Sequence, residues 1–450
     1  MNIAFVTPEY VTEFDVFDGG LANYLRRNAL SLIILGHKPI IIVGSNENSI
    51  QVQNNIEVHK VRISKKGNSS LYWIEQSYIL NQYLEKLCTI TRIDIIQYSS
   101  FSGIGYFRNY RVPCVVRISS FHPLLSSRYE RVRDVEDFKL ELIEKTGLLK
   151  SDAVYGPSKL IAKDIKDSYG IDATIIESPY IKDTFEFDYT LYNDILNGQP
   201  YFLYFGSVGL LKGCKTIADI LPEFFEKYDN IKFCFIGKDA GYQGRSMMEY
   251  ILHKAGKYKE NVKYLDRLKH NLLFPFIENA QCLVLPSRID NFPNTCIEAM
   301  ALGKIVIGTK NTGFDQLITN GVNGFLCEAD NPVSLLNSIE IVNGLTKEEK
   351  EIISANAKAR IAMLSPVIKV PELIDYYKQV IDNFNLKSKL SNDEAEVHDN
   401  LILEMLQRRE LEIENLIKQI NDQKKHLDSL YQSRSYRLGN KLINILKFKF

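Results

Sequence analysis

The sequence predicts an α/β protein with two parallel-sheet halves that face a cleft, followed by a helical C-terminal tail. Three observations predict this fold class. Short apolar runs alternate with amphipathic segments of helical period, which is typical of parallel strands covered on both faces. This series weakens across residues 181–200 and then begins again. After Ser391 it gives way to a heptad pattern.

The composition is that of a globular protein with more than one domain. The chain has 450 residues, 45% hydrophobic and 24% charged, which excludes wholesale disorder. At about 150 residues per domain, the length predicts two or three domains. Because 55 Lys and Arg balance 55 Asp and Glu, the whole chain has no bias toward polyanions, and we expect no nucleic-acid partner.

Residues 1–180 are predicted to form the first domain. Its first helix is expected over Gly20–Leu35, where apolar residues recur at helical spacing and Gly36 follows as a cap. The predicted strands are Ile3–Val6, Ile40–Val43, Ile95–Tyr98, Val115–Ile118 and Ala153–Tyr155.

A linker is expected over residues 181–200 and a second domain over 201–365. The second series of strands is predicted at Tyr201–Phe205, Phe233–Ile236, Val262–Leu265, Cys282–Leu285 and Ile305–Ile307. A further helix is expected over 366–386, with one apolar side formed by Val367, Val370, Leu373, Ile374 and Tyr377. A ligand is then expected between the halves, at the carboxyl ends of the strands.

The tail divides into two segments of opposite charge. Residues 393–430 carry ten acidic and five basic residues, and 431–450 carry five basic residues and no acidic one. The first segment predicts a coiled coil, with a single solvated helix as the alternative. Its core columns are Leu406, Ile413, Ile420 and Leu427, and Ile402, Arg409, Leu416, Gln423 and Leu430. The second predicts a basic amphipathic helix on an anionic membrane, or one that packs on the protein itself or a partner.

The remaining signals concern the compartment. Seven cysteines are scattered singly without a CxxC pair, which favours buried, reduced thiols. No secretory signal and no run of about 18 apolar residues is evident. We therefore expect a cytoplasmic protein, peripheral on the inner face of the plasma membrane through its tail.

The first candidate binding segment is the glycine pair Gly19 and Gly20, between the first strand and the first helix. Glycines there let the backbone approach a ligand, and the helix N-terminus favours an anion. A plain tight turn explains the pair about as well.

The second segment follows the first strand of the second half and contains Gly206, Ser207 and Lys212. A glycine turn followed by a lysine suits a phosphate group, which needs close backbone and a cation. Taken alone, a lysine such as Lys212 is more often a solvated surface residue.

The third segment spans residues 286–303, a polar loop that leads into a helix near Pro293. Asp290 and Glu298 can face one cleft, where carboxylates accept hydrogen bonds from sugar hydroxyls. The free N–H groups of Asn294 to Cys296 suit a diphosphate. The alternative for Glu298 is a carboxylate in the N-terminal turn that complements the helix dipole. A fourth segment supplies turns at 311–315 and 320–324 that are expected to line the site.

The order of these segments resembles glycosyltransferase family 4. The resemblance covers about residues 2 to 380, and its most specific block is Pro286–Gly303. It implies a GT-B fold of two Rossmann-like domains and a retaining transfer from a nucleotide-sugar. The chain departs from the family pattern twice: Asp290 stands for the first glutamate of the carboxylate pair, and Ser207 for the usual phosphate-binding arginine.

The resemblance also implies roles for single residues. Lys212 and the amides near Thr295 would hold the diphosphate, Glu298 the ribose, and Asp290 with its loop the donor sugar. His122 aligns with a histidine placed near the anomeric carbon, and a structural histidine is the alternative. No metal and no cofactor beyond the co-substrate is expected. The full set of donor-binding candidates is Gly19, Gly20, Gly206, Ser207, Lys212, Asn291, Phe292, Asn294, Thr295 and Glu298.

The predicted function is transfer of a sugar to a growing bacterial glycan, lipid-linked polysaccharide or lipopolysaccharide. Two alternatives stay open at this point. One is a sugar-nucleotide-binding scaffold that recruits partners, or a second copy, through the coiled coil. The other is a GT-B-like nucleotide-sugar epimerase, for which acid and base side chains are not evident.

Overall fold

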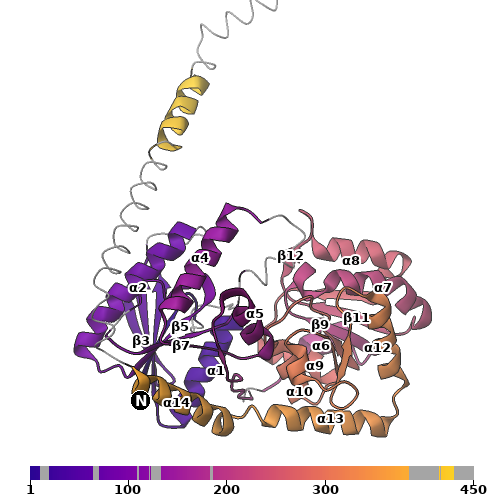
Figure 1. Ribbon diagram of the computed structural model, residues 1–450. Coiled ribbons are helices and arrows are strands. Elements are labelled where there is room, and N and C mark those ends of the chain that lie inside the picture. The colour runs from indigo at the N-terminus through magenta and orange to yellow at the C-terminus, as the bar shows by residue number, and fades with distance from the viewer. Residues whose placement is uncertain are drawn as a thin grey trace, which may run out of the picture. The chain divides into compact units, whose positions relative to one another are not determined.

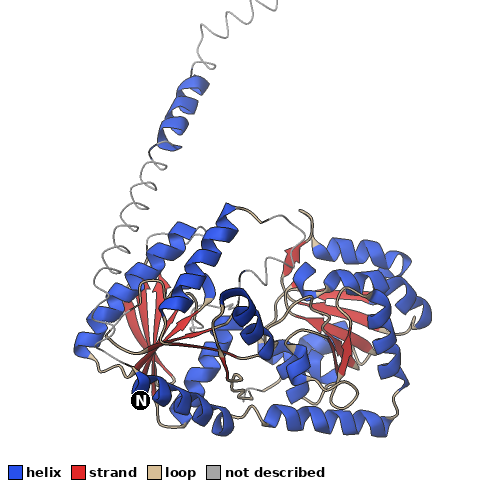
Figure 2. Ribbon diagram, in the orientation of Figure 1, coloured by secondary structure: helices blue, strands red, loops and turns tan. Residues whose placement is uncertain are grey.

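A computed structural model gives the structure of residues 1–10, 20–63, 70–108, 111–120, 122, 133–182, 186–384, 415 and 417–429. Met1–Asn385 form one compact unit and Leu386–Phe450 a second. The described part of the first unit holds two large sheets, each flanked by helices, and a small two-stranded sheet (Figures 1 and 2). The α/β fold class with largely parallel sheets is thereby confirmed.

The first sheet has eight strands in the order β3-β4-β2-β1-β5-β6-β7-β8. All neighbours are parallel except β3 and β4, which form an antiparallel edge. The strands are β1 (Asn2–Thr7), β2 (Lys38–Ser45), β3 (Ser49–Gln53), β4 (Ile56–Arg62), β5 (Ile95–Ser99), β6 (Cys114–Arg117), β7 (Ala153–Gly156) and β8 (Thr174–Ile175), and the helices are α1 (Gly20–Ile34), α2 (Ser70–Ile90), α4 (Val135–Lys150) and α5 (Lys159–Tyr169).

Alternation along β1 shows why this sheet is covered on both faces. Ile3 and Phe5 lie in one apolar cluster with α1, whereas Ala4 and Val6 lie in another with α2 and α5. Successive strand side chains point to opposite faces, so a continuously apolar strand needs helices on both sides. The predicted two-sided sheet is observed.

The second sheet has six parallel strands in the order β13-β11-β9-β14-β15-β16, and β10 pairs with β12 beside it. The strands are β9 (Tyr201–Phe205), β10 (Val208–Gly209), β11 (Lys232–Ile236), β12 (Asp239–Gly241), β13 (Val262–Leu265), β14 (Cys282–Val284), β15 (Val306–Thr309) and β16 (Phe325–Cys327), and the helices are α6 (Thr190–Ile195), α7 (Cys214–Lys227), α8 (Met247–Ala255), α9 (His270–Asn279), α10 (Asn294–Ala301), α11 (Phe314–Leu317), α12 (Pro332–Gly344) and α13 (Lys347–Ala362).

The segment expected as a linker contains a helix. Tyr192 of α6 and the following Leu196 are buried in the apolar core of the second sheet. Polar residues around Tyr192 and Leu196 weaken the apolar pattern in the sequence, although the segment packs against the second sheet.

The last helix of the first unit, α14 (Pro366–Asn383), returns to the first sheet. Its residues Val370, Leu373 and Tyr377 share an apolar cluster with Ile3 and Phe5 of β1, and Figure 1 shows α14 near the N-terminus. The predicted apolar side is correct except at Val367, which is 69% exposed because it lies in the first turn, before the helix reaches the sheet.

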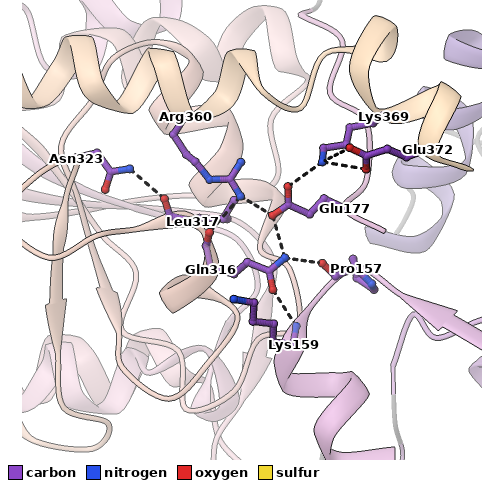
Figure 3. A network of polar contacts seen from close by, with 9 residues as sticks. All are labelled: Pro157, Lys159, Glu177, Gln316, Leu317, Asn323, Arg360, Lys369 and Glu372. Atoms are coloured by element: carbon purple, nitrogen blue, oxygen red, sulfur yellow. Dashed lines mark hydrogen bonds and ion pairs between the residues drawn. The ribbon is translucent and has the colours of Figure 1, made fainter. Parts of the chain in front are cut away.

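A polar network joins α13 and α14 to the first half of the chain (Figure 3). Glu177, which follows β8, accepts a hydrogen bond from Arg360 of α13 at 2.5 Å and lies 3.4 Å from Lys369 of α14. Gln316 of α11 donates to Glu177 and to the carbonyl of Pro157, each at 2.9 Å. The two halves are therefore tied together on this side.

In the second unit the structure describes Asn415 and residues 417–429, which are helical. The exposed fractions of Ile417, Ile420 and Leu427 are 52%, 62% and 51%. The rest of the predicted coiled coil and all of 431–450 lie outside the described residues. No helix in the described part of the chain is long and apolar enough to cross a membrane.

Candidate active site

A cleft of about 1150 Å³ lies between the two halves of the first unit. Among the described residues that line it, the basic ones are Arg26, Arg117, Lys212, Lys238, Arg267 and Lys269, and the acidic ones are Glu9, Glu186, Asp290 and Glu298. The described lining thus carries more basic than acidic side chains, which suits a polyanionic ligand.

Lys212 and Asp290 meet in this cleft. Lys212 ends a short 3₁₀ turn, Leu210–Lys212, and donates from Nζ to Oδ2 of Asp290 at 2.6 Å. Their loops can approach because Gly213 has no side chain: a Cβ there would lie 1.8 Å from the carbonyl oxygen of Pro286. Gly213 also has φ of 75°, which favours glycine.

Helix α10 begins directly after this loop, and its first residues line the cleft. No side chain in the described part of the chain caps its N-terminus, and the first intrahelical bond is donated by the N–H of Ile297 to Pro293 at 3.2 Å. The backbone N–H groups of Asn294 to Cys296 are therefore left without an intrahelical acceptor, as at any helix start. Together with the helix dipole they favour an anion.

Glu298 lies one turn further along α10 and is held from the opposite half. Arg27 of α1 donates from Nη2 to Oε1 of Glu298 at 2.7 Å, and both side chains are buried. The Arg27 guanidinium also lies 5.2 Å from the ring centre of Tyr180. The carboxylate is thus fixed by a residue that the sequence motifs did not identify.

The glycine segments converge on the same cleft. Gly20 begins α1, and a Cβ there would lie 3.7 Å from Nδ2 of Asn294 on α10. Gly206, with φ of 131°, and Ser207 follow β9 and line the cleft. Gly19 lies outside the described residues.

Asn291 and Phe292 also line the cleft, but the Asn291 side chain is engaged by the first half. Its Oδ1 accepts from Ser158 at 2.5 Å, and its Nδ2 donates to the carbonyl of Ser119 at 3.2 Å. In this arrangement Asn291 joins the two halves, and its predicted donor contact stays a prediction.

His122 is not among the residues that line the cleft. Its Nε2 lies 3.0 Å from Oδ1 of Asp137, and its backbone N–H donates to Glu144 at 3.1 Å. Glu144 also accepts from the N–H of Ser102 at 3.1 Å, so this buried carboxyl holds the loops after β5 and β6. Burial raises its pKa to about 8, against the two N–H donors, which lower it.

The predicted turns at 311–315 and 320–324 do not line the cleft; that expectation is wrong. The first supports the Asp290 loop from behind: the N–H of Gly313 donates to the Asp290 carbonyl at 2.8 Å. Asn323 of the second turn donates to the carbonyl of Leu317 (Figure 3). Both turns are structural.

Two family models match the chain. Residues 18–178 match the model described as Glycosyltransferase Family 4, and residues 193–360 match Glycosyl transferases group 1. The gap between the matches, residues 179–192, falls where the predicted strand series weakens.

Curated relatives support the same class. The 2-deoxystreptamine N-acetyl-D-glucosaminyltransferase of Niallia circulans is 24% identical over 45% of this chain and 48% of its own length. A glycosyltransferase of Methanocaldococcus jannaschii is 22% identical over 76% of this chain and 89% of its own. The chain therefore spans about half the length of the first relative and most of the second.

Solved structures agree in fold. Sucrose-phosphate synthase of Thermosynechococcus elongatus superposes with a TM-score of 0.69 at 16% identity, over 85% of this chain and 99% of that one. The Anabaena protein HepE in complex with UDP and glucose gives 0.63 at 15%, over 84% of this chain and all of that one. Two facing parallel-sheet halves and these matches define a glycosyltransferase of GT-B fold. The chain belongs to glycosyltransferase family 4.

Proposed function

We propose that this enzyme is a retaining hexosyltransferase that moves a sugar from a nucleotide-sugar to a hydroxyl of a growing bacterial glycan. The lipid-linked precursor of a surface polysaccharide or lipopolysaccharide is the proposed acceptor. One observation carries the proposal: the Lys212–Asp290 pair, the uncapped start of α10 and Glu298 share one positively charged cleft.

The first proposed step is an exchange of partners at Lys212. A donor diphosphate placed between Lys212 and the α10 amides replaces Asp290 as the partner of the ammonium group, because phosphate carries the higher charge. Asp290 is then released to accept hydrogen bonds from the donor sugar. Glu298 uses one oxygen for Arg27 and offers the other to the ribose.

Cleavage of the glycosyl bond builds negative charge on the leaving phosphate and positive charge on the sugar. Lys212 and the α10 amides stabilise that phosphate, which is where preorganised dipoles lower a barrier most. The acceptor hydroxyl attacks the face from which the phosphate leaves, and a phosphate oxygen takes its proton. This route needs no metal, so EDTA should leave the rate unchanged; loss of transfer that Mg²⁺ or Mn²⁺ restores contradicts it.

The names of two relatives suggest a donor to try first. Both the Niallia circulans enzyme and the lipopolysaccharide 1,2-N-acetylglucosaminetransferase of Salmonella typhimurium transfer N-acetylglucosamine by name. The second is 24% identical over 37% of this chain. UDP-N-acetylglucosamine therefore heads the panel of donors.

The test measures nucleotide release from UDP-, GDP- and ADP-sugars, with lipid-linked glycan acceptors present. Release that depends on the acceptor, with α-linked product from an α-linked donor, supports the proposal. Nucleotide binding without turnover indicates the scaffold instead. Conversion of the donor to its epimer without an acceptor indicates the epimerase. No binding and no turnover with any donor overturns the transferase.

We further propose that residues 431–450 bring the enzyme to the anionic inner face of the plasma membrane, and that 393–430 pair with a second copy. The basis is sequence: five basic residues and no acidic one in the last twenty. A chain ending at residue 430 should lose binding to phosphatidylglycerol vesicles and keep transfer to soluble acceptors. If the shortened chain still floats with the vesicles, the membrane-anchor proposal is wrong. If the full chain sediments as a monomer, the proposed pairing through residues 393–430 is wrong.

A further inference from the structure

Arg117, the last residue of β6, lies in the wall of the cleft in an unusual environment. It is 5% exposed. Its Nη1 donates to Oγ of Ser119 at 2.9 Å and its Nη2 to Oγ of Ser178 at 3.0 Å. Its guanidinium carbon lies 3.4 Å from the ring centre of Tyr24 on α1. Three chain segments thus fix the position of the guanidinium.

The charge of Arg117 has no carboxylate partner within 4.0 Å among the described residues. The other two buried arginines do: Arg27 pairs with Glu298 at 2.7 Å, and Arg108 with Asp152 at 2.9 Å. Burying a charge without an opposite charge beside it is unfavourable. A cation–π contact recovers only part of that loss. The fold therefore carries a cost at Arg117 that an anionic ligand would offset.

The residues around Arg117 face the cavity. Tyr24, Ser119 and Ser178 all line the same cleft as Arg117. Each serine oxygen accepts a guanidinium hydrogen, so the hydroxyl proton of each serine remains available to a ligand. A phosphate or carboxylate group that meets Arg117 would thus find two hydroxyl donors beside it.

We propose that Arg117, Ser119 and Ser178 form a binding site for an oxyanion carried by a substrate. A guanidinium suits phosphate and carboxylate groups, since its N–H donors are planar and rigid. Two sources can supply the group: the donor diphosphate, or a phosphate or carboxylate on the acceptor glycan. That the anion belongs to a substrate rests on the proposed function.

The test titrates inorganic phosphate into the full chain by calorimetry, with and without saturating UDP. Arg117→Gln should weaken phosphate binding at least tenfold, and Arg117→Lys should weaken it less because the charge remains. Lys215→Gln, which removes the same charge outside the cleft, is the control and should bind phosphate as the wild type does. Phosphate binding by Arg117→Gln within twofold of the wild type, or no phosphate binding by the wild type, overturns the proposal.

The two UDP conditions identify the source. If UDP-saturated protein still binds phosphate and Arg117→Gln abolishes this, the anion belongs to the acceptor. If UDP excludes phosphate and Arg117→Gln weakens UDP binding itself, the anion is the donor diphosphate. If circular dichroism shows that Arg117→Gln does not fold, the double variant Ser119→Ala and Ser178→Ala is used instead. We expect this variant to bind phosphate at least threefold more weakly than the wild type. Unchanged phosphate binding contradicts the site.

The outcome is separable from that of the proposed function. If the protein transfers no sugar but its phosphate binding depends on Arg117, the anion site is supported and the transferase proposal is overturned. If the protein transfers sugar but Arg117→Gln binds phosphate as the wild type does, the transferase proposal is supported and the anion site is overturned.

Discussion

Arg27 of α1 and Glu298 of α10 form a buried ion pair across the cleft, with 2.7 Å between Nη2 and Oε1. The two residues belong to opposite halves of the first unit and are 271 positions apart in the chain. The carboxylate proposed to hold the ribose is therefore oriented by the opposite half. The Arg27 contact with Glu298 therefore depends on the spacing of the two halves.

Arg27→Met should destabilise the protein by about 3–5 kcal/mol, because it leaves the buried Glu298 carboxylate without its partner. The double change Arg27→Met and Glu298→Leu should recover most of this loss, since an apolar pair is often as stable as a buried ion pair. Urea unfolding of the two variants measures both. A single variant within about 1 kcal/mol of the wild type would show that the pair is not formed in solution.

Lys212→Met should reduce UDP affinity at least tenfold, the loss of one charge-assisted contact of about 1.4 kcal/mol or more. Its stability should change by less than about 1 kcal/mol, because the pair with Asp290 is partly exposed. Lys215→Met is the matched control: Lys215 pairs with Asp219 at 2.9 Å and does not line the cleft. Equal loss of UDP affinity in both variants contradicts a specific role for Lys212.

Gly213→Ala should destabilise the protein by at least about 2 kcal/mol more than Gly170→Ala. Both glycines have positive φ, 75° and 68°, so both changes cost backbone strain. At Gly213 the new Cβ meets the Pro286 carbonyl oxygen at 1.8 Å, whereas no described atom lies within 4 Å of a Cβ at Gly170. Thermal or urea unfolding compares the two. Equal losses would mean that the Lys212 and Asp290 loops do not approach this closely.

Glu144 should make stability depend on pH between about 5 and 8. Its folded pKa of about 8 lies above its ordinary value of 4.5, so the folded state keeps a proton that the unfolded state loses. Its contribution is complete below pH 4.5 and declines as pH rises toward 8, by up to about 1.4 kcal/mol per pH unit.

Glu144→Gln should flatten this part of the profile, and Glu136→Gln, at an exposed position of the same helix, should not. Urea unfolding at a series of pH values measures the slopes. If Glu144→Gln and wild type give parallel profiles, the carboxyl is not held in the protonated form.

The strands were predictable where they are buried on both faces. The run Tyr201–Phe205 is apolar throughout and forms β9 with the predicted bounds. In contrast, β3 (Ser49–Gln53) was missed because it is an edge strand, with polar residues at alternate positions and Val52 70% exposed. Apolar content reports burial, so it detects largely apolar strands, including the edge strand β13, which was predicted with its observed bounds. It overlooks strands with several polar residues in their run, as in β4, which is interior but contains His59, Lys60 and Arg62.

The site was predictable to the extent that its residues follow strand ends. Lys212, Asp290 and Glu298 each lie near the carboxyl end of a strand in the second sheet, and the fold brings them to one cleft. Arg27 and Arg117 were not identified, since their roles arise from residues far away in the chain. One signal was present for Arg27: it lies within the predicted helix Gly20–Leu35, whose apolar side is expected to be buried, and a buried charged residue needs a partner.

Helix α14 has a consequence for how the chain is made. Its buried residues complete the apolar cluster that begins with Ile3 and Phe5. During synthesis, the first sheet emerges from the ribosome some 200 residues before this helix does. The part of this face that α14 covers, beside α1, therefore stays exposed while the whole second half is translated, and a nascent chain that stalls before residue 366 presents this apolar surface to chaperones and proteases.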